Sequence, residues 1–209
     1  MLLQNRVNPN GTIFSTSARG TFMGNRGGAL HNGSREIVRQ FMGHRWITCL
    51  LEFKGRHRQV MSPGLYTELF FLDEAVALAA GHRPCAECQR GRFKAFVDSW
   101  KESTCREGTG ALLAPEIDRE LHSARIGGRR EKITYAAPLE SLPDGCFVQI
   151  GDGNHLVWEG ALLLWSAAGY IKKEPRPVGL TVTVLTPEPT LRCLRHGYRP
   201  EIHSSALSL

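Results

Sequence analysis

The chain has 209 residues, of which 42% are hydrophobic and 22% are charged, and its formal net charge is +6. This length and composition are those of an ordered protein with one good core or two modest ones, and they exclude an intrinsically disordered chain. A membrane-spanning helix needs a run of about 18 apolar residues, which does not occur, and Arg6 interrupts the start before a signal-peptide core can form. We therefore expect a cytoplasmic protein that does not bind membranes, in an oligomeric state that the sequence leaves open.

Short strands and turns are predicted for the first part of the chain. The sequence Asn-Pro-Asn-Gly at 8–11 lies between the segments 3–7 and 12–15, and this arrangement predicts a β-hairpin. The glycine-rich segment 20–28 has the composition of a loop. The chain therefore begins with a hairpin that leads into a loop.

A second hairpin is predicted further along. Residues 46–53 are rich in β-branched and aromatic side chains, and Lys-Gly-Arg at 54–56 can turn the chain back along 57–61. Segment 66–71 has a similar apolar and aromatic composition and predicts a further strand.

Helical periodicity begins after this strand. Asp73 can cap a helix that ends at Gly81, because glycine readily adopts the left-handed conformation that closes a helix. Residues 85–101 place apolar side chains at i, i+3, i+4 and i+7, which predicts a second helix with Cys88 in its first turn. A third helix is predicted at 115–125.

The second half of the chain changes character. From Ile133 onward, β-rich segments alternate with Pro-Asp-Gly and Gly-Asp-Gly-Asn turns, and a short helix is predicted at 189–195. We expect an α+β fold in which N-terminal β-hairpins and a helix–zinc knuckle–helix unit precede a small β-rich half. Residues 1–126 would form the zinc-knuckle domain, and residues 131–209 would pack against it.

The cysteines indicate a metal site. Six cysteines in this chain are too few for a disulfide scaffold, but Cys85 and Cys88 form one close pair. Two thiolates at this spacing across a turn point to one side, where a tetrahedral zinc ion can bind both, and Pro84 fixes the entry to the turn. A redox-active disulfide pair is the alternative, although Arg83 and Pro84 precede it and no thioredoxin-like βαβ pattern is present.

The residues around this pair, Leu-Ala-Ala-Gly-His-Arg-Pro-Cys-Ala-Glu-Cys-Gln at 78–89, resemble the second half of the zinc domain of the Ada DNA-repair family. In that family four cysteines hold zinc, the later two in a Gly-aromatic-Arg-Pro-Cys-x-x-Cys knuckle, and the domain binds DNA. The resemblance implies a zinc module and favours DNA over RNA as a partner. The first cysteine pair of the family has no match here, so a reactive methyl-accepting thiol is not implied.

A structural zinc ion needs about four protein ligands, so two more must come from elsewhere. Cys49 and then His57 are the first candidates, because the predicted second hairpin would bring both toward the knuckle. Cys146 and Cys193 stand among apolar residues and are expected in the core. The remaining candidate ligands are His31, His44, His82, His122 and Cys105.

The positive charge favours a polyanionic partner, since each neutralised phosphate of a nucleic acid releases counterions. Several arginines lie close to the cysteine pair in the sequence or in the glycine-rich segment. The predicted nucleic-acid-binding residues are Arg26, Arg56, Arg58, Arg83, Arg90 and Arg92.

Catalytic residues are harder to assign from the sequence. His31 follows the glycine-rich segment, which could hold a phosphate. Glu52 and Lys54 resemble the acid-x-Lys end of the PD-(D/E)xK nuclease core, in which carboxylates hold Mg²⁺. We therefore expect a zinc-stabilised DNA-binding protein of DNA repair or modification. A metal-dependent enzyme of nucleic-acid processing and a zinc-stapled protein-interaction module remain the alternatives.

Overall fold

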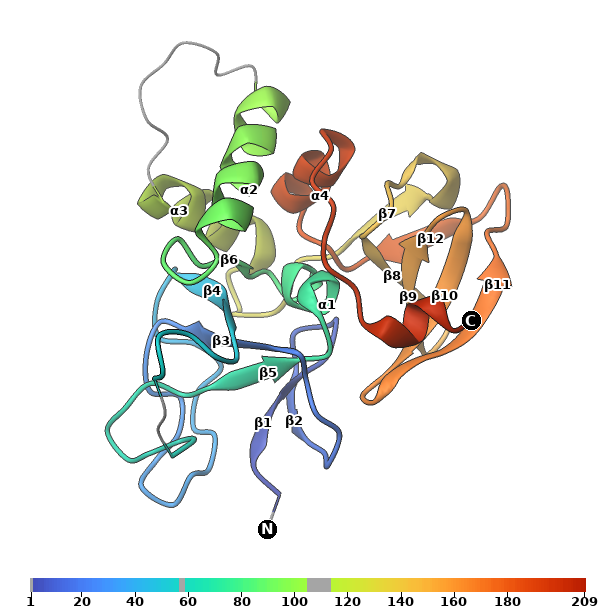
Figure 1. Ribbon diagram of the computed structural model, residues 1–209. Helices are drawn as coiled ribbons and strands as arrows, with labels where there is room; N and C mark the ends of the chain where they lie inside the picture. Colours follow the sequence, from blue (N-terminus) through green and yellow to red (C-terminus); the bar gives the residue numbers. More distant parts are fainter. Residues whose placement is uncertain (1, 57–58, 105–113) are drawn as a thin grey trace.

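The computed structural model describes residues 2–56, 59–104 and 114–209 (Figure 1). Within these residues the chain forms four α-helices and two six-stranded sheets, so the α+β class is confirmed. The two sheets lie on either side of a short central helix, with the other helices above them in the view of Figure 1. No helix in the described ranges is long and apolar enough to cross a membrane.

The first sheet comes from the N-terminal half of the chain. In spatial order its strands are β2 (Ile13–Ser15), β1 (Gln4–Val7), β5 (Leu69–Phe71), β3 (Phe22–Arg26), β4 (Trp46–Leu50) and β6 (Arg83–Pro84). Strands β1 and β5 are parallel, as are β4 and β6, and the remaining neighbours are antiparallel. The predicted hairpin at 3–15 is confirmed, because β1 and β2 pair across the turn.

The glycine-rich segment 20–28 is not the predicted loop, since most of it forms the interior strand β3. Gly24 is needed there because the chain is crowded: a Cβ at this position would lie 2.4 Å from the carbonyl oxygen of Ile47 and 2.7 Å from the ring of Phe71. A glycine in a strand can thus mark a close approach of neighbouring groups instead of a turn.

The second predicted hairpin is also wrong. Strand β4 ends at Leu50 and pairs with β3 on one side and β6 on the other. Residues 60–61 form a turn, and residues 57–58 lie outside the described residues. The partners of β4 are therefore distant in sequence, which the local turn signal at 54–56 does not reveal.

Helix α1 (Glu74–Ala79) is the central helix of the fold, and all its residues are buried. Asp73 caps it as predicted, with the Val76 amide donating to its carboxylate at 2.9 Å. At the other end the amides of Gly81 and His82 donate to the carbonyls of Leu78 and Ala77, and Gly81 adopts a φ of +92°. This is the glycine-closed helix end predicted from the sequence.

The second sheet is antiparallel throughout, and it fulfils the expectation of a β-rich half. Two short 3-10 helices, Leu139–Ser141 and Ser204–Leu207, accompany it. Its strands in spatial order are β11 (Gly169–Pro175), β10 (Ala161–Ser166), β9 (Gly153–Trp158), β8 (Phe147–Ile150), β12 (Thr181–Val184) and β7 (Tyr135–Pro138).

Three further helices lie against one another (Figure 1). Helix α4 (Glu188–Arg195), close to the C-terminus, contacts both α2 (Arg90–Ser103) and α3 (Ala114–Arg125). All three match predicted helices, with one difference. Helix α2 begins at Arg90, so Cys88 lies in the turn before it and not in its first turn.

The hydrophobic core joins the two halves of the chain. One buried cluster contains Phe71 and Phe147, and another contains Trp100, Cys146 and Cys193. Cys146 and Cys193 are fully buried, in accord with their expected place in the core. Both clusters combine side chains from before residue 126 with side chains from after residue 131, so the β-rich half shares its core with the first half.

Candidate metal centre

Cys49, Cys85 and Cys88 come together because β6 pairs with β4. The pairing is parallel and places Thr48 opposite Pro84, so the next residues along the two segments are Cys49 and Cys85. The Cys85 amide donates to the Thr48 carbonyl at 2.9 Å, and the side-chain amide of Gln89 donates to the same oxygen at 2.7 Å. These bonds fix the turn that carries Cys85 and Cys88 against the end of β4.

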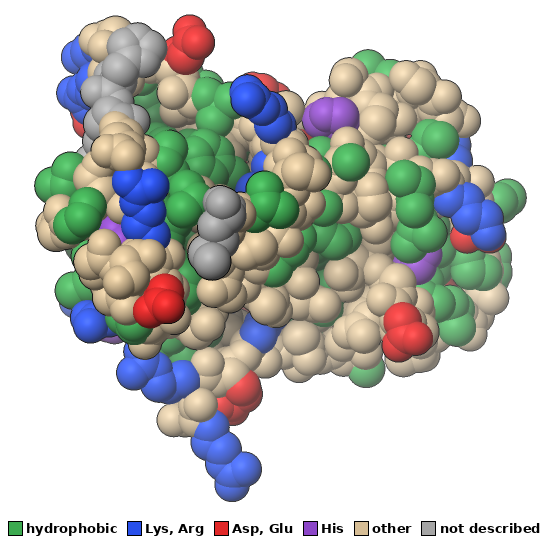
Figure 2. All heavy atoms as spheres, turned by 90° about the horizontal axis from the view of Figure 1, so that it is seen from below, with side chains coloured by type: hydrophobic (Ala, Val, Ile, Leu, Met, Phe, Trp, Pro, Cys, Tyr) green, Lys and Arg blue, Asp and Glu red, His purple; other side chains and the backbone are tan. Residues whose placement is uncertain are grey.

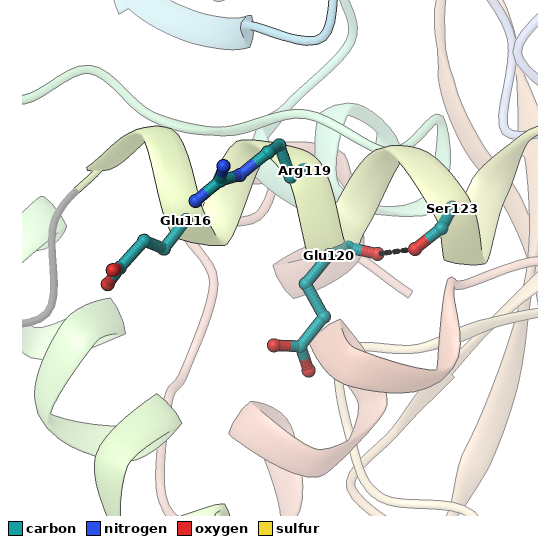
Figure 3. A pocket seen from close by; sticks show the side chains of 4 residues that line it. All are labelled: Glu116, Arg119, Glu120 and Ser123. Carbon is teal, nitrogen blue, oxygen red and sulfur yellow. Dashed lines mark hydrogen bonds between the residues drawn. The ribbon is translucent and has the colours of Figure 1, made fainter.

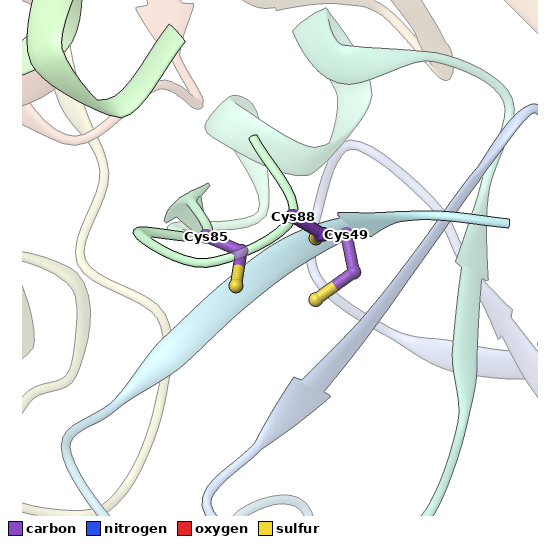
Figure 4. A group of neighbouring side chains, drawn as sticks. All are labelled: Cys49, Cys85 and Cys88. Atoms are coloured by element: carbon purple, nitrogen blue, oxygen red, sulfur yellow. The ribbon is translucent and has the colours of Figure 1, made fainter. Parts of the chain in front are cut away.

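The three sulfur atoms all lie within 4.8 Å of one another. Figure 4 shows Cys49 on its strand and Cys85 and Cys88 on the neighbouring turn. Four sulfurs bound tetrahedrally at about 2.3 Å from zinc would be about 3.8 Å apart. The observed spacing therefore fits a metal ion after small rotations of the side chains. Cys85 is 8% exposed and the other two are half-buried, so an ion bound here would be largely shielded from water.

The turn also stabilises negative charge on sulfur. The Glu87 amide donates to the Cys85 sulfur at 3.4 Å. Hydrogen bonds from the Cys49 and Cys88 thiols, together with this amide, hold the pKa of Cys85 well below its ordinary value, whereas the same contacts and burial raise the pKa of Cys49. The three cysteine side chains are thus hydrogen-bonded to one another, and a cation bound between them would favour the thiolate form of all three.

The other predicted ligands are not beside these sulfurs in the described part of the chain, where the three cysteines form the ligand cluster. His57 and Cys105 lie outside the described residues. His44 and His122 stack on each other with ring centroids 4.1 Å apart. His82 is buried against the ring of Trp46, and His31 is buried against Thr67.

The three catalytic candidates have ordinary structural surroundings. His31 is buried, with one ring nitrogen 2.6 Å from the Thr67 hydroxyl and the other 3.2 Å from the Ser62 carbonyl. Glu52 and Lys54 are exposed in the turn after β4, not on a strand as the nuclease pattern requires. In the described ranges Glu52 does not belong to a group of three potential ligands, so a carboxylate site for Mg²⁺ is not formed there.

Two of the predicted nucleic-acid-binding arginines are in the interior. Arg83 forms a bidentate ion pair with Asp118, both bonds being 2.8 Å long. Arg26 is 2% exposed and donates to the carbonyl of Gly11 at 2.9 Å. Neither guanidinium lies on the outer surface, where it could contact the phosphates along a nucleic-acid strand. For Arg83, closeness to the cysteines in sequence does not indicate exposure.

The remaining arginines are closer to the surface. Arg56 is exposed and pairs with Glu87, a residue of the cysteine turn, at 2.7 Å. Arg90 is exposed at the start of α2. Arg92 is half-buried and forms an ion pair with the buried Glu74. Arg58 lies outside the described residues.

Asp118 is a positioning residue that the sequence did not single out. It lies on α3 between Ile117 and Leu121, two buried apolar residues, and is itself 4% exposed. A carboxylate buried at an apolar position needs a cationic partner, which here is Arg83 next to the cysteine turn. The sequence signal for this role is an acidic residue at a position where the predicted helix 115–125 would bury an apolar side chain.

Three cysteines from two segments of the chain are therefore placed so that they can hold a metal ion. All three donors are sulfur atoms, and soft thiolate ligands favour zinc, copper(I) and iron–sulfur clusters over magnesium and calcium. No protein-family model matches the chain, and no significant match was found among curated proteins or solved structures.

Proposed function

We propose that the three cysteines bind a structural zinc ion and that the protein binds nucleic acid, DNA in preference to RNA, in DNA repair or modification. The observation that carries the proposal is the cluster of Cys49, Cys85 and Cys88. Zinc suits this cluster because zinc is bound by cysteine thiolates in structural sites and has no redox chemistry of its own. Zinc takes about four ligands, and among the described residues the three cysteines are the ones that cluster.

Surface charge beside the cysteines supports the nucleic-acid part of the proposal. Arg56, which pairs with Glu87 of the cysteine turn, and Arg90, which follows the turn in sequence, are both exposed, and the chain as a whole carries a net charge of +6. Figure 2 shows lysine and arginine side chains along one side and the projecting lower edge of one face, with acidic side chains interspersed among them. The likeness of the cysteine turn to the Ada zinc knuckle points to the same class of partner.

Binding of fluorescent duplex DNA, measured by anisotropy over a range of salt concentrations, tests this function. The logarithm of the association constant should fall linearly with the logarithm of the salt concentration. Exchanging both Arg56 and Arg90 for glutamine should lower the slope by about two if each contacts a phosphate. Lys172→Gln, on the exposed side of β11, is the matched control and should leave the slope unchanged.

The same measurement separates the alternatives. Comparison of duplex DNA with RNA of the same sequence tests the preference for DNA. Binding that is absent at low salt would contradict the proposal and favour the protein-interaction module instead.

A further inference from the structure

A second cluster, made of cationic and aromatic side chains, lies on the opposite side of β4 from the cysteines. Side chains alternate along a strand, so Trp46 and Thr48 face one way, into the protein, and Cys49 faces the other. A cavity of about 290 Å³ opens beside Trp46. The cationic and aromatic side chains of its wall are Arg26, Phe41, Trp46, Arg125, Arg130 and Lys132.

Aromatic rings hold three of these cations in place. The guanidinium carbons of Arg26 and Arg125 lie 4.2 Å and 4.0 Å from the centre of the Trp46 ring, so the indole orients both. Arg130, which is exposed, lies 4.5 Å from the centre of the Phe41 ring. Strand β3, helix α3 and the segment after it thus direct cations to one cavity, and the rings supply cation–π contacts.

The two arginines beside Trp46 are buried without a carboxylate partner among the described residues. Arg26 and Arg125 are 2% and 1% exposed, and their hydrogen bonds go to backbone carbonyls and histidine rings. Lys132 donates to the carbonyls of Pro9 and Ala79. Of the residues that the structure describes, those lining the cavity include no aspartate or glutamate.

Two other arginines are arranged differently. The buried Arg83 lies against Asp118, and the half-buried Arg92 lies against Glu74. Asp118 partly offsets the lowering of the pKa of Arg125, but its two oxygens are already bonded to Arg83. The described residues that line the cavity supply no such carboxylate.

The pKa values of these cations are lowered, because the arrangement disfavours their charged forms. Burial lowers the pKa of Arg26 to about 9, and burial and the charge of Arg26 lower the pKa of Arg125 to about 8. The same two causes lower the pKa of Lys132 to about 7. His82 and His122 also have lowered pKa values, because burial and nearby arginines disfavour their charged forms. An anion in the cavity would relieve this repulsion.

The surroundings of these cations point to the identity of the anion. We infer that the cavity binds a phosphate group, carried by the end of a nucleic-acid strand or by a small phosphorylated molecule such as a nucleotide. Several cations that converge from separate elements suit a group with two charges and several acceptor oxygens, and guanidinium groups bind phosphate in a planar, bidentate way. The volume lies near the lower limit for ligand pockets, roughly 300 Å³, so it has room for a phosphate and its adjoining sugar but not for several nucleotides.

Another depression in the surface does not have these features. Glu116, Arg119, Glu120 and Ser123 line it on the outer face of α3 (Figure 3). Their side chains spread along the helix, and the hydrogen bond drawn there joins Ser123 to the backbone of the same helix. No group of buried cations faces this surface in the described part of the chain.

Thermal unfolding of the full chain with added inorganic phosphate tests the inference. At about 100 times its Kd, phosphate should raise the Tm of the wild-type protein by roughly 5 to 10 °C. Lys132→Gln should weaken phosphate binding about tenfold or more, as expected for the loss of a charge-assisted hydrogen bond. Arg130→Gln should act in the same direction and, because Arg130 is exposed, it provides a variant whose folding is not at risk. Arg129→Gln is the control, since Arg129 is exposed and does not line the cavity.

A comparison of oligonucleotides identifies the source of the phosphate. If a 5′-phosphorylated strand binds more tightly than its 5′-hydroxyl form, and the advantage disappears in Lys132→Gln, the cavity holds the end of a strand. If phosphate and a mononucleotide stabilise the protein while the two strands bind equally, the ligand is a small phosphorylated molecule. Either result supports a phosphate pocket.

Two results would overturn it: no change of Tm with phosphate or nucleotide, or an equal change in the wild type and both cavity variants. Stabilisation by a dicarboxylate alone would also refute the assignment to phosphate. The inference does not depend on the proposed DNA binding by Arg56 and Arg90, because those residues do not line the cavity.

Discussion

Replacing Asp118 with asparagine removes the charge that balances Arg83 in the interior. The two side chains are 6% and 2% exposed, so water cannot replace the lost carboxylate. Arg83 would keep a 3.0 Å hydrogen bond to the Pro84 carbonyl and its position over the Phe93 ring. Removal of one partner of a buried ion pair typically costs about 3 to 5 kcal/mol. For a chain of this length the corresponding fall in Tm is roughly 6 to 20 °C.

Urea unfolding monitored by circular dichroism measures this cost. Asp98→Asn is the matched control, because Asp98 pairs with Lys94 on the exposed side of α2, where the two side chains are 51% and 80% exposed. That change should alter the free energy of unfolding by less than about 1 kcal/mol. If Asp118→Asn also costs less than about 1 kcal/mol, Arg83 does not need a charged partner in the interior.

Three further changes test other parts of the structure. Burial lowers the pKa of Lys132 from 10.5 to about 7, so above pH 7 the unfolded chain binds more protons and stability should rise with pH, by up to about 1.4 kcal/mol per unit. Lys132→Met should remove this part of the slope in urea titrations at pH 7 and 8.5, and equal slopes would refute the explanation. Asp73→Ala removes the cap of α1 and the acceptor for Tyr170 and should cost about 2 to 4 kcal/mol in the same assay; a cost below about 1 kcal/mol would contradict this. Gly24→Ala places a methyl group 2.4 Å from the Ile47 carbonyl and should lower the Tm by several degrees, whereas an unchanged Tm would show that β3 and β4 can separate easily.

Features that depend on neighbouring residues could be predicted from the sequence. Asp73 and Gly81 mark the two ends of α1 because capping and glycine-closed helix ends are local hydrogen-bonding patterns. The first hairpin also follows from its turn residues. The spacing of Cys85 and Cys88 predicts a shared metal ion with Cys49 as a further ligand, and the structure places all three sulfurs within 4.8 Å of one another.

Features that depend on distant pairing could not be predicted in this way. The predicted hairpin at 46–61 would have brought Cys49 to the knuckle, but the parallel pairing of β4 with β6 does so instead. The glycines at 20–28 suggested a loop because their composition does not show that Gly24 packs against Phe71. The burial of Arg26 and Arg83 likewise depends on partners from other elements.

Metal analysis of protein purified under reducing conditions tests the zinc site most directly. The wild-type protein should contain stoichiometric zinc, and both Cys85→Ser and Cys49→Ser should lose most of it, since each supplies one of three clustered sulfurs. Cys193→Ala, which changes a thiol buried in the core, should keep its zinc. A wild-type protein that is free of metal and remains fully folded with a chelator present would contradict the zinc site, and so would a Cys49→Ser protein with its full complement of zinc.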